Sequence, residues 1–258
     1  RYAAAILVLL SFAAAVLILH QRKLAQQPVL LATLLLMLLF WQGLLGKWTV
    51  TLRLHPLVVM SHLLGGFALL SVLWLLLLRL KPFHIPACTS QEEKLRPWAI
   101  LGLLFIILQI SLGGWTSANY AAFVCTDFPM CQGQWWPPMN FSAGFHLSFN
   151  AEQNYEGGVL STTARTAIQM SHRLGALITT SYLACLIYKL FGTRQGSLLR
   201  RIGLILLLLL IIQISLGALN VLWALPLLIA MAHNAVAALL LLSLITLNIY
   251  LTLDKGKI

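Results

Sequence analysis

Three histidines of this 258-residue chain lie inside long apolar stretches, where an ionisable side chain is costly and therefore a candidate for function. They are His62, His172 and His233. A neutral imidazole can bind a metal centre through either ring nitrogen, or it can hydrogen-bond a neighbouring helix as a structural group. The elements around the three histidines decide between these roles.

The composition places these histidines in a membrane protein. Hydrophobic residues make up 60% of the chain, charged residues 9%, and the mean hydropathy is +0.90, whereas a soluble domain is about 25% charged. That balance excludes a soluble globular enzyme, a disordered chain and a disulfide-dense secreted domain. The net charge of +11 is interpreted as membrane topology and not as nucleic-acid binding. We therefore predict an all-α polytopic membrane protein.

Seven segments are long and apolar enough to span a bilayer, which takes about 20 residues of helix. Prolines and charged residues separate them, as at Pro28, Pro56 and Pro226. The predicted transmembrane helices are Tyr2–Leu19, Val29–Gly46, Leu57–Leu78, Trp98–Trp115, Thr166–Leu190, Ile202–Leu222 and Leu227–Leu251.

Lysine and arginine are distributed unevenly between alternate connections. Twelve of the 17 fall in every second connection and in the C-terminal segment, and five fall on the other side. By the positive-inside rule, the side with twelve faces the cytoplasm. The C-terminus is then cytoplasmic and the long 116–165 connection is external. We interpret that connection as a lid over the outer mouth of the bundle that the last four predicted helices form. A simple solvated loop is the alternative.

An internal repeat relates the two halves of the chain. Gln109-Ile-Ser-Leu-Gly113 recurs as Gln213-Ile-Ser-Leu-Gly217, and Gln42-Gly-Leu-Leu-Gly46 has the same glutamine-to-glycine spacing. The interval from Gln42 to His62 equals the interval from Gln213 to His233. The second and third spans therefore match the sixth and seventh at one constant offset.

Extending the repeat pairs the start of the first span with His172-Arg173. It thus predicts a further histidine just before Arg1, on a span that this chain lacks. We expect two four-helix bundles related as parallel repeats, with the first helix of the first bundle missing. Residues 1–90 hold three helices of the first bundle, and residues 91–258 hold all four of the second.

The histidines are matched in depth. His62 follows Pro56 by six residues and His233 follows Pro226 by seven, so each imidazole lies roughly 10 Å into its helix from the outer end. All the spans that carry these histidines run from outside to inside. Their side chains therefore meet at one level and form pairs.

A pair of facing imidazoles within apolar helices suits a haem. Zinc would need further Cys, Asp or Glu ligands, and no carboxylate lies in any predicted span. A haem needs axial ligands and small residues where the ring passes, and Gly66, Ala176 and Ala237 stand one turn beyond the histidines. We predict bis-histidine haem sites, while structural histidines and another metal stay open.

Three glutamines, Gln42, Gln109 and Gln213, each precede a glycine by four residues. We expect them to hydrogen-bond the ligand histidines and fix the ring tautomer. Ordinary hydrogen bonding between helices is the alternative.

Several stretches resemble the haem A synthase family, and together they cover essentially the whole chain. They are Gln109–Tyr120, Cys125-Thr-Asp-Phe-Pro-Met-Cys131, Gln134–Phe141, His55–Gly66 and Met170-Ser-His-Arg-Leu-Gly175. The family consists of eight-helix membrane proteins made of two pseudo-symmetric four-helix bundles. It converts haem O to haem A for terminal respiratory oxidases, by successive hydroxylations of a ring methyl group to a formyl group.

The resemblance implies an oxidoreductase of a bacterial inner membrane with haem b as its cofactor. His172 and His233 would be the axial ligands of the haem b, and His62 would ligate the substrate haem. The family's catalytic glutamate would precede Arg1, so no catalytic residue is named in this chain, which we interpret as an N-terminally truncated fragment. Arg173 adjoins a ligand and would pair with haem propionates, or it would anchor its helix at the membrane interface.

The partners that the resemblance implies are membrane lipid, haem O, a haem O synthase (farnesyltransferase) and an electron donor that the sequence does not identify. Nucleic acid is not expected, and a homo-oligomer stays open. Two other functions fit paired histidines: a diheme b-type electron-transfer protein, and a haem carrier.

The remaining cysteines and histidines are interpreted more simply. Cys125 and Cys131 lie in the external connection, where the environment is oxidising, so we predict a disulfide between them. A metal site there lacks a second cysteine pair. Other residues in or near connections are expected to be free thiols or to have no ligand role; they are Cys88, Cys185, His20, His55, His84 and His146.

Overall fold

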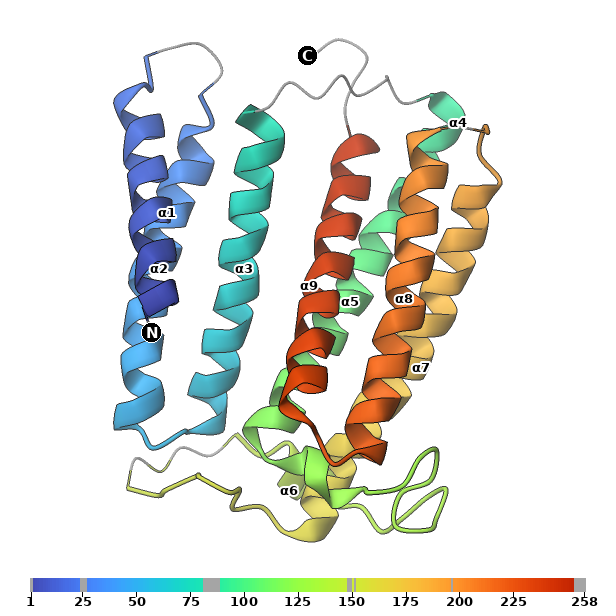
Figure 1. Cartoon of the computed structure of the whole chain (residues 1–258). Helices are drawn as coiled ribbons and strands as arrows, with labels where there is room; N and C mark the ends of the chain where they lie inside the picture. Colours follow the sequence, from blue (N-terminus) through green and yellow to red (C-terminus); the bar gives the residue numbers. More distant parts are fainter. Residues whose placement is uncertain are drawn as a thin grey trace. The chain divides into compact units, whose positions relative to one another are not determined.

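The computed structural model describes residues 2–23, 27–80, 89–147, 150, 152–195 and 197–252. Over these residues the chain is helical and forms no strand, and seven of its helices are long and apolar enough to cross a membrane (Figure 1). This confirms the predicted all-α polytopic membrane fold. The long helices are α1 (Tyr2–His20), α2 (Val29–Thr51), α3 (Pro56–Leu80), α5 (Arg96–Ala118), α7 (Thr162–Phe191), α8 (Leu198–Leu222) and α9 (Leu227–Tyr250).

Some helices extend beyond the apolar segments that predict them, because capping and backbone hydrogen bonds set their ends. The helix α7 begins four residues early, where the Ser161 hydroxyl accepts a hydrogen bond from the Ala164 amide at 3.4 Å. The helix α2 continues past Gly46, and the Thr49 hydroxyl donates back to the Gly46 carbonyl at 2.7 Å. Three short helices were not predicted: α4 (Ser90–Glu93), η1 (Ala121–Val124) and α6 (Phe141–Gly144).

The chain divides into two compact units. Unit 1 comprises residues 1–85 and 151–154, and unit 2 comprises residues 86–150 and 155–258. In unit 1, α2 packs against both α1 and α3. The core of unit 1 consists of Ala15, Ile18, Ala32, Leu35 and Leu76. The assignment of a substrate haem to 1–90 and a cofactor haem to 91–258 stays a prediction.

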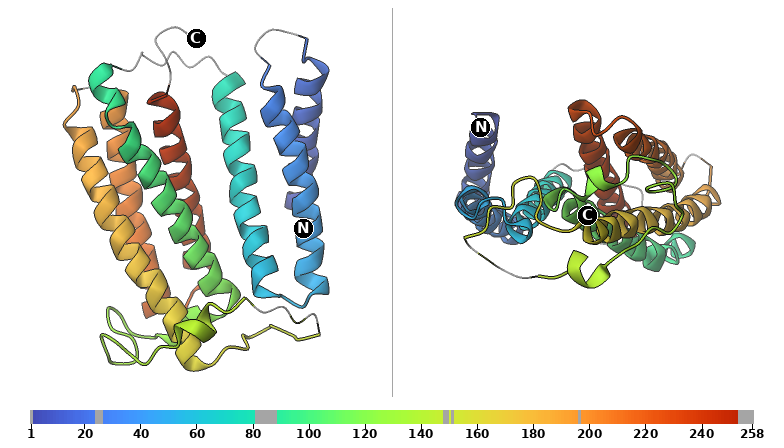
Figure 2. Two further views of the ribbon diagram at one scale, coloured as in Figure 1. Left: turned by 180° about the vertical axis from the view of Figure 1, so that it is seen from behind. Right: turned by 90° about the horizontal axis from the view of Figure 1, so that it is seen from below.

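Unit 2 is a ring of four helices. The helix α5 packs against α7 and α9, and α8 packs against the same two helices (Figure 2). Consequently α7 and α9 stand at diagonal corners. The connection from α5 to α7 lies where α7 and α9 begin, and we call this the loop end of unit 2. The other end we call the tail end.

Each helix of unit 2 directs one stripe of residues, spaced alternately by three and four, into the centre of the ring. The tail half of every stripe is apolar or small and closely packed: Leu183, Leu190, Leu206 and Leu244 are all fully buried. The loop half of the same stripes carries polar and small residues instead. From the tail half towards the loop end, the residues of the α5 stripe are Gln109, Gly113 and Thr116, and those of the α7 stripe are Ala176, His172, Gln169 and Arg165. The residues of the α8 stripe are Gln213, Gly217 and Asn220, and those of the α9 stripe are Ala237 and His233.

The sequence repeat is visible in the backbone. In the α2–α3 turn, Arg53 and Leu54 have φ values of 48° and 61°, and in the α8–α9 turn Ala224 and Leu225 have 54° and 60°. The Leu54 amide donates to the Thr49 carbonyl at 2.8 Å, and the Leu225 amide donates to the Asn220 carbonyl at 2.8 Å. The two turns occupy equivalent positions of the repeat. Each therefore repeats a left-handed backbone that non-glycine residues adopt at a cost.

Removing a side chain from the packed half of unit 2 should destabilise the protein. Leu183 is fully buried in α7, and Leu183→Ala should cost about 2–5 kcal/mol because it leaves a cavity. Leu177 lies on the same helix but is 64% exposed, so Leu177→Ala is the matched control and should cost less than about 1 kcal/mol. Thermal unfolding of the purified protein in detergent measures both, and equal losses would contradict this packing.

Candidate functional site

His172 and His233 face the centre of unit 2 from diagonal helices. His172 lies on α7 and His233 on α9, both in the loop half of the ring. Both histidines therefore lie in the same four-helix unit, and their pairing around one ligand stays a prediction.

A glutamine and a glycine on the adjacent helix hold each of the three intramembrane histidines. The imidazole packs edge-on against the glycine: a Cβ at Gly113 would lie 3.0 Å from Cε1 of His172, and one at Gly217 would lie 3.2 Å from Cε1 of His233. A Cβ at Gly46 would lie 3.3 Å from Cε1 of His62. Any larger side chain at these glycines would push the ring away. The glycine of the repeated motif is thus a contact surface for imidazole.

Each glutamine hydrogen-bonds its histidine, but only two of the three reach the imidazole ring as predicted. Gln109 Nε2 donates to the His172 carbonyl at 3.0 Å and lies 3.0 Å from His172 Nδ1. Gln213 Nε2 lies 3.1 Å from Nε2 of His233. Gln42 Nε2 donates to the His62 carbonyl at 3.2 Å. The glutamines of unit 2 therefore reach the imidazole rings, whereas in unit 1 the bond is to the backbone.

The two glutamine–histidine pairs differ in the residue that stands three positions after the histidine. Three residues after the histidine, α7 has Gly175 and α9 has Val236. A Cβ at Gly175 would lie 2.5 Å from Oε1 of Gln109, so the glutamine amide occupies the space that a side chain would fill. With valine at that position in α9, the amide of Gln213 bonds the ring and not the backbone carbonyl.

The residues around His172 and His233 fit an iron porphyrin. His233 Nδ1, Gln109 Oε1 and Gln213 Oε1 are buried without a hydrogen-bond partner, which is costly unless a ligand or a rearrangement satisfies them. Both imidazoles are only half-buried, in contrast to the fully buried leucines of the tail half. Across the described ranges no group of three His, Cys, Asp or Glu is arranged to hold a metal ion. Two histidines with small neighbours would suit haem as a ligand.

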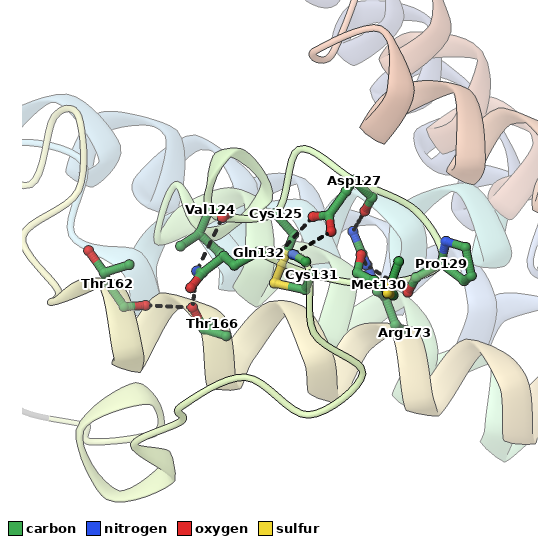
Figure 3. Close-up of a disulfide and its surroundings, with 11 residues drawn as sticks. Val124, Cys125, Asp127, Pro129, Met130, Cys131, Gln132, Thr162, Thr166 and Arg173 are labelled. Carbon is green, nitrogen blue, oxygen red and sulfur yellow. Dashed lines mark hydrogen bonds between the residues drawn. A yellow bond between two sulfur atoms is a disulfide. The ribbon is translucent and has the colours of Figure 1, made fainter.

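The Cys125–Cys131 segment packs onto α7 between Thr166 and Arg173 (Figure 3). The predicted disulfide is present, with the two Cα atoms 4.8 Å apart. Both cysteines are buried and contact Met170 of α7. A hydrogen bond also joins the segment to α7: the Gln132 side-chain amide nitrogen donates to the Thr166 hydroxyl at 3.0 Å. The disulfide segment is therefore a fixed part of the loop end.

Arg173, the neighbour of His172, anchors this segment. Its guanidinium donates to the carbonyls of Met130 at 2.8 Å, Asp127 at 3.0 Å and Pro129 at 3.3 Å. The same group lies 5.8 Å from the ring centroid of Phe128. The sequence suggested a propionate contact or a membrane anchor for Arg173, and it missed this role because the path of the connection is not encoded locally. The propionate contact stays a prediction.

Asp127 stabilises the disulfide segment from within. Its carboxylate accepts hydrogen bonds from the amides of Gly133 and Gln132, each at 2.8 Å. The Gly133 bond is the largest cause that holds the pKa of Asp127 below its usual value of 3.8, and the charge of Arg173 lowers that pKa further. Because the pKa is lower in the folded protein, this carboxylate contributes stability at neutral pH and loses it as the pH falls below about 3.8.

Among the other candidates, His20 and His146 are exposed and His55 is buried. Cys185 is a free thiol, as predicted. Cys88 and His84 lie outside the described residues.

Comparisons with known proteins agree on one family. The family model COX15-CtaA, described as a cytochrome oxidase assembly protein, matches residues 1–245. A heme A synthase of Shewanella oneidensis is 48% identical over 215 residues, which are 83% of this chain and 64% of that protein. Heme A synthases of Neorickettsia sennetsu and Caulobacter vibrioides are 28% and 26% identical, over 93% and 78% of this chain and 70% and 56% of theirs. The chain spans less than two thirds of the Shewanella protein.

The anchoring of the disulfide segment by Arg173 can be tested by reduction. Arg173→Gln removes charged donors to three carbonyls, so the segment should open more often and the disulfide should be reduced about ten-fold faster. The rate of labelling by a thiol reagent in dithiothreitol measures this. Arg200→Gln, at an exposed arginine of α8, is the control and should leave the rate unchanged. An unaltered rate in Arg173→Gln would show that the segment is held by other contacts.

Proposed function

The chain belongs to the COX15-CtaA family of cytochrome oxidase assembly proteins, and we propose that it acts as a haem A synthase. In this role it is an oxidoreductase that oxidises a ring methyl group of haem O to the formyl group of haem A. Three relatives that carry this name support the proposal. The structural observation that carries it is the pair of imidazoles on diagonal helices of unit 2, each held by a glutamine and a glycine.

His172 and His233 would hold a resident haem b. When bound, that haem would supply one-electron transfer to or from the reacting haem. Gln109 holds the imidazole of His172 from α5, and Gln213 holds that of His233 from α8. Ring orientation and tautomer are set by such neighbours of a ligand histidine. Flipping the amide of Gln213 would exchange its oxygen and nitrogen, so that Gln213 could accept a hydrogen bond from a protonated ring nitrogen of His233.

His62 would bind the substrate haem in unit 1. The hydrogen bond of Gln42 is to the backbone carbonyl of His62 and not to its ring. Nδ1 of His62 is buried without a hydrogen-bond partner. A ring held only at its backbone can reorient when a substrate enters and leaves, whereas a resident cofactor favours rings held directly. This difference between Gln42 and Gln109 supports an exchangeable site in unit 1 and a permanent one in unit 2.

The proposed setting follows from the same function. The protein would span the bacterial inner membrane, with the loop end of unit 2 outside and the C-terminus in the cytoplasm, as the lysine and arginine distribution indicates. The long connection would then cover the outer mouth of unit 2. Its partners would be membrane lipid, haem O and an electron donor. A haem O synthase as partner and a homo-oligomer stay predictions.

Extraction of pigments tests the proposed function. Membranes of cells that make haem O but lack their own haem A synthase should contain haem A or hydroxylated haem O once the full protein is present. His62→Ala should reduce these products at least ten-fold, because the substrate loses an axial ligand. Chromatography of the extracted haems measures them.

The control is His20→Ala, at an exposed histidine at the end of α1, which should form the wild-type products. If the wild-type protein yields only haem O and protohaem while it binds haem, the protein is an electron-transfer subunit or a haem carrier.

A further inference from the structure

The stripe of α7 carries a cation and an amide into the centre of unit 2. Starting from His172, the positions three and seven residues towards the loop end are Gln169 and Arg165. The same alternating spacing leads the other way through Thr179 to Leu183 and Leu190, which are buried in the core. Arg165 and Gln169 therefore occupy core positions of the helix and point with His172 into the ring.

These side chains have polar atoms that nothing satisfies. Arg165 Nε, Gln169 Oε1 and Asn220 Oδ1 are buried without a hydrogen-bond partner. Gln169 is 5% exposed and Asn220 is 8% exposed, so both are more than nine-tenths buried. A buried polar group left in this state is costly. Because these groups lie on the adjacent helices α7 and α8, a polar ligand bound between them would satisfy them.

Asn220 differs from the residues at the equivalent positions of the repeat, and the difference leaves a polar atom available to a ligand. The positions seven residues after the glutamine are Thr49 in α2, Thr116 in α5 and Asn220 in α8. The hydroxyl of each threonine has a hydrogen-bond partner within its own helix. Thr49 donates to the Gly46 carbonyl at 2.7 Å, and Thr116 donates to the Leu112 carbonyl at 2.8 Å. The Asn220 side chain has a free acceptor instead. Rotation of its amide would present two donors in the same place.

The positive charge of Arg165 and the position of Arg165 and Asn220 along their helices indicate which ligand would bind. No Asp or Glu occurs in α5, α7, α8 or α9, so these helices offer Arg165 no carboxylate. Arg165 precedes His172 by seven residues, and Asn220 follows Gln213, the partner of His233, by seven. Both therefore lie about 10 Å from the imidazole level towards the loop end. Arg173, by contrast, already donates to three backbone carbonyls.

We propose that Arg165, Gln169 and Asn220 form a carboxylate-binding site that receives the propionates of the haem held by His172 and His233. This inference rests on the proposed function only in that a haem occupies unit 2. The guanidinium donates paired hydrogen bonds to a carboxylate, and the two amides donate through their nitrogens. The macrocycle is thereby oriented with its anionic edge at the loop end and its apolar edge against the packed tail half.

Release of haem from unit 2 tests the site. The full protein with His62→Ala, which removes the axial ligand of unit 1, is loaded either with protohaem or with its dimethyl ester. Transfer to an excess of a soluble haem-binding protein gives the release rate. Protohaem should leave about ten to a hundred times more slowly than the ester, because only its carboxylates accept charge-assisted hydrogen bonds. Equal rates would overturn the proposal without any substitution at the site.

Substitutions assign the effect to residues. Arg165→Gln should release protohaem at about the rate of the ester and remove the difference between the two ligands. Gln169→Leu and Asn220→Leu should each accelerate protohaem release about three- to ten-fold. Arg200→Gln is the matched control and should behave like the parent. If the ester effect persists in full in Arg165→Gln, the residue does not bind the propionates.

Two further outcomes distinguish a propionate site from a lipid site and from the enzyme activity itself. If esterification has no effect but Arg165→Gln removes a co-purifying phospholipid, the residues bind a lipid headgroup and the proposal is wrong. If the protein forms no haem A yet shows the ester effect, the proposed enzyme activity fails while the carboxylate site stands. A unit 2 that binds no haem would overturn the site.

Discussion

The constraint on which unit 2 depends is the placement of two histidines, His172 and His233, on diagonal helices. Neither helix can position its histidine alone, because an imidazole on a helix in an apolar environment has several rotamers and two ring nitrogens. The adjacent helix supplies what is missing. A glycine gives the ring a flat surface, with the glycine's hypothetical Cβ only 3.0 Å or 3.2 Å from the ring, and a glutamine four residues earlier bonds it. The position of each histidine is therefore defined by a pair of helices, α5 with α7 and α8 with α9.

This arrangement explains why unit 2 is built in two halves. Polar groups inside a membrane destabilise the fold unless they are paired, and the loop half of unit 2 contains several that are not. The tail half compensates through close packing of leucines and glycine, as where a Cβ at Gly102 would lie 3.1 Å from Leu186. The packed half fixes the spacing of the four helices, and the polar half would use that spacing to hold the proposed haem.

The sequence predicts the helices and the glutamine–histidine pairs because both depend on short-range periodicity. A run of about 20 apolar residues leaves few alternatives to a membrane helix, and the interval from Gln213 to His233 fixes two facing positions across one turn. The heptad spacing from His172 leads equally to Arg165 and Gln169 when the stripe is followed towards the loop end, so these residues too are within reach of the sequence.

Long-range contacts and helix ends were harder to predict. The partners of Arg173 lie far from it along the chain, in the connection, and only the folded path of that segment brings them to α7. The sequence therefore places Arg173 beside a ligand but does not reveal its hydrogen bonds. Helix ends were missed where single hydroxyls decide them, as Ser161 does for α7.

The most direct measurement asks whether His172 and His233 bind the same iron. In the full protein with His62→Ala, the amount of low-spin haem per polypeptide is measured by electron paramagnetic resonance for His172→Ala, His233→Ala and the double variant. If one iron lies between the two imidazoles, each single variant should lose the entire bis-imidazole signal and the double variant should lose no more. Losses of about half in each single variant, adding up in the double variant, would show two separate haems and contradict the shared site.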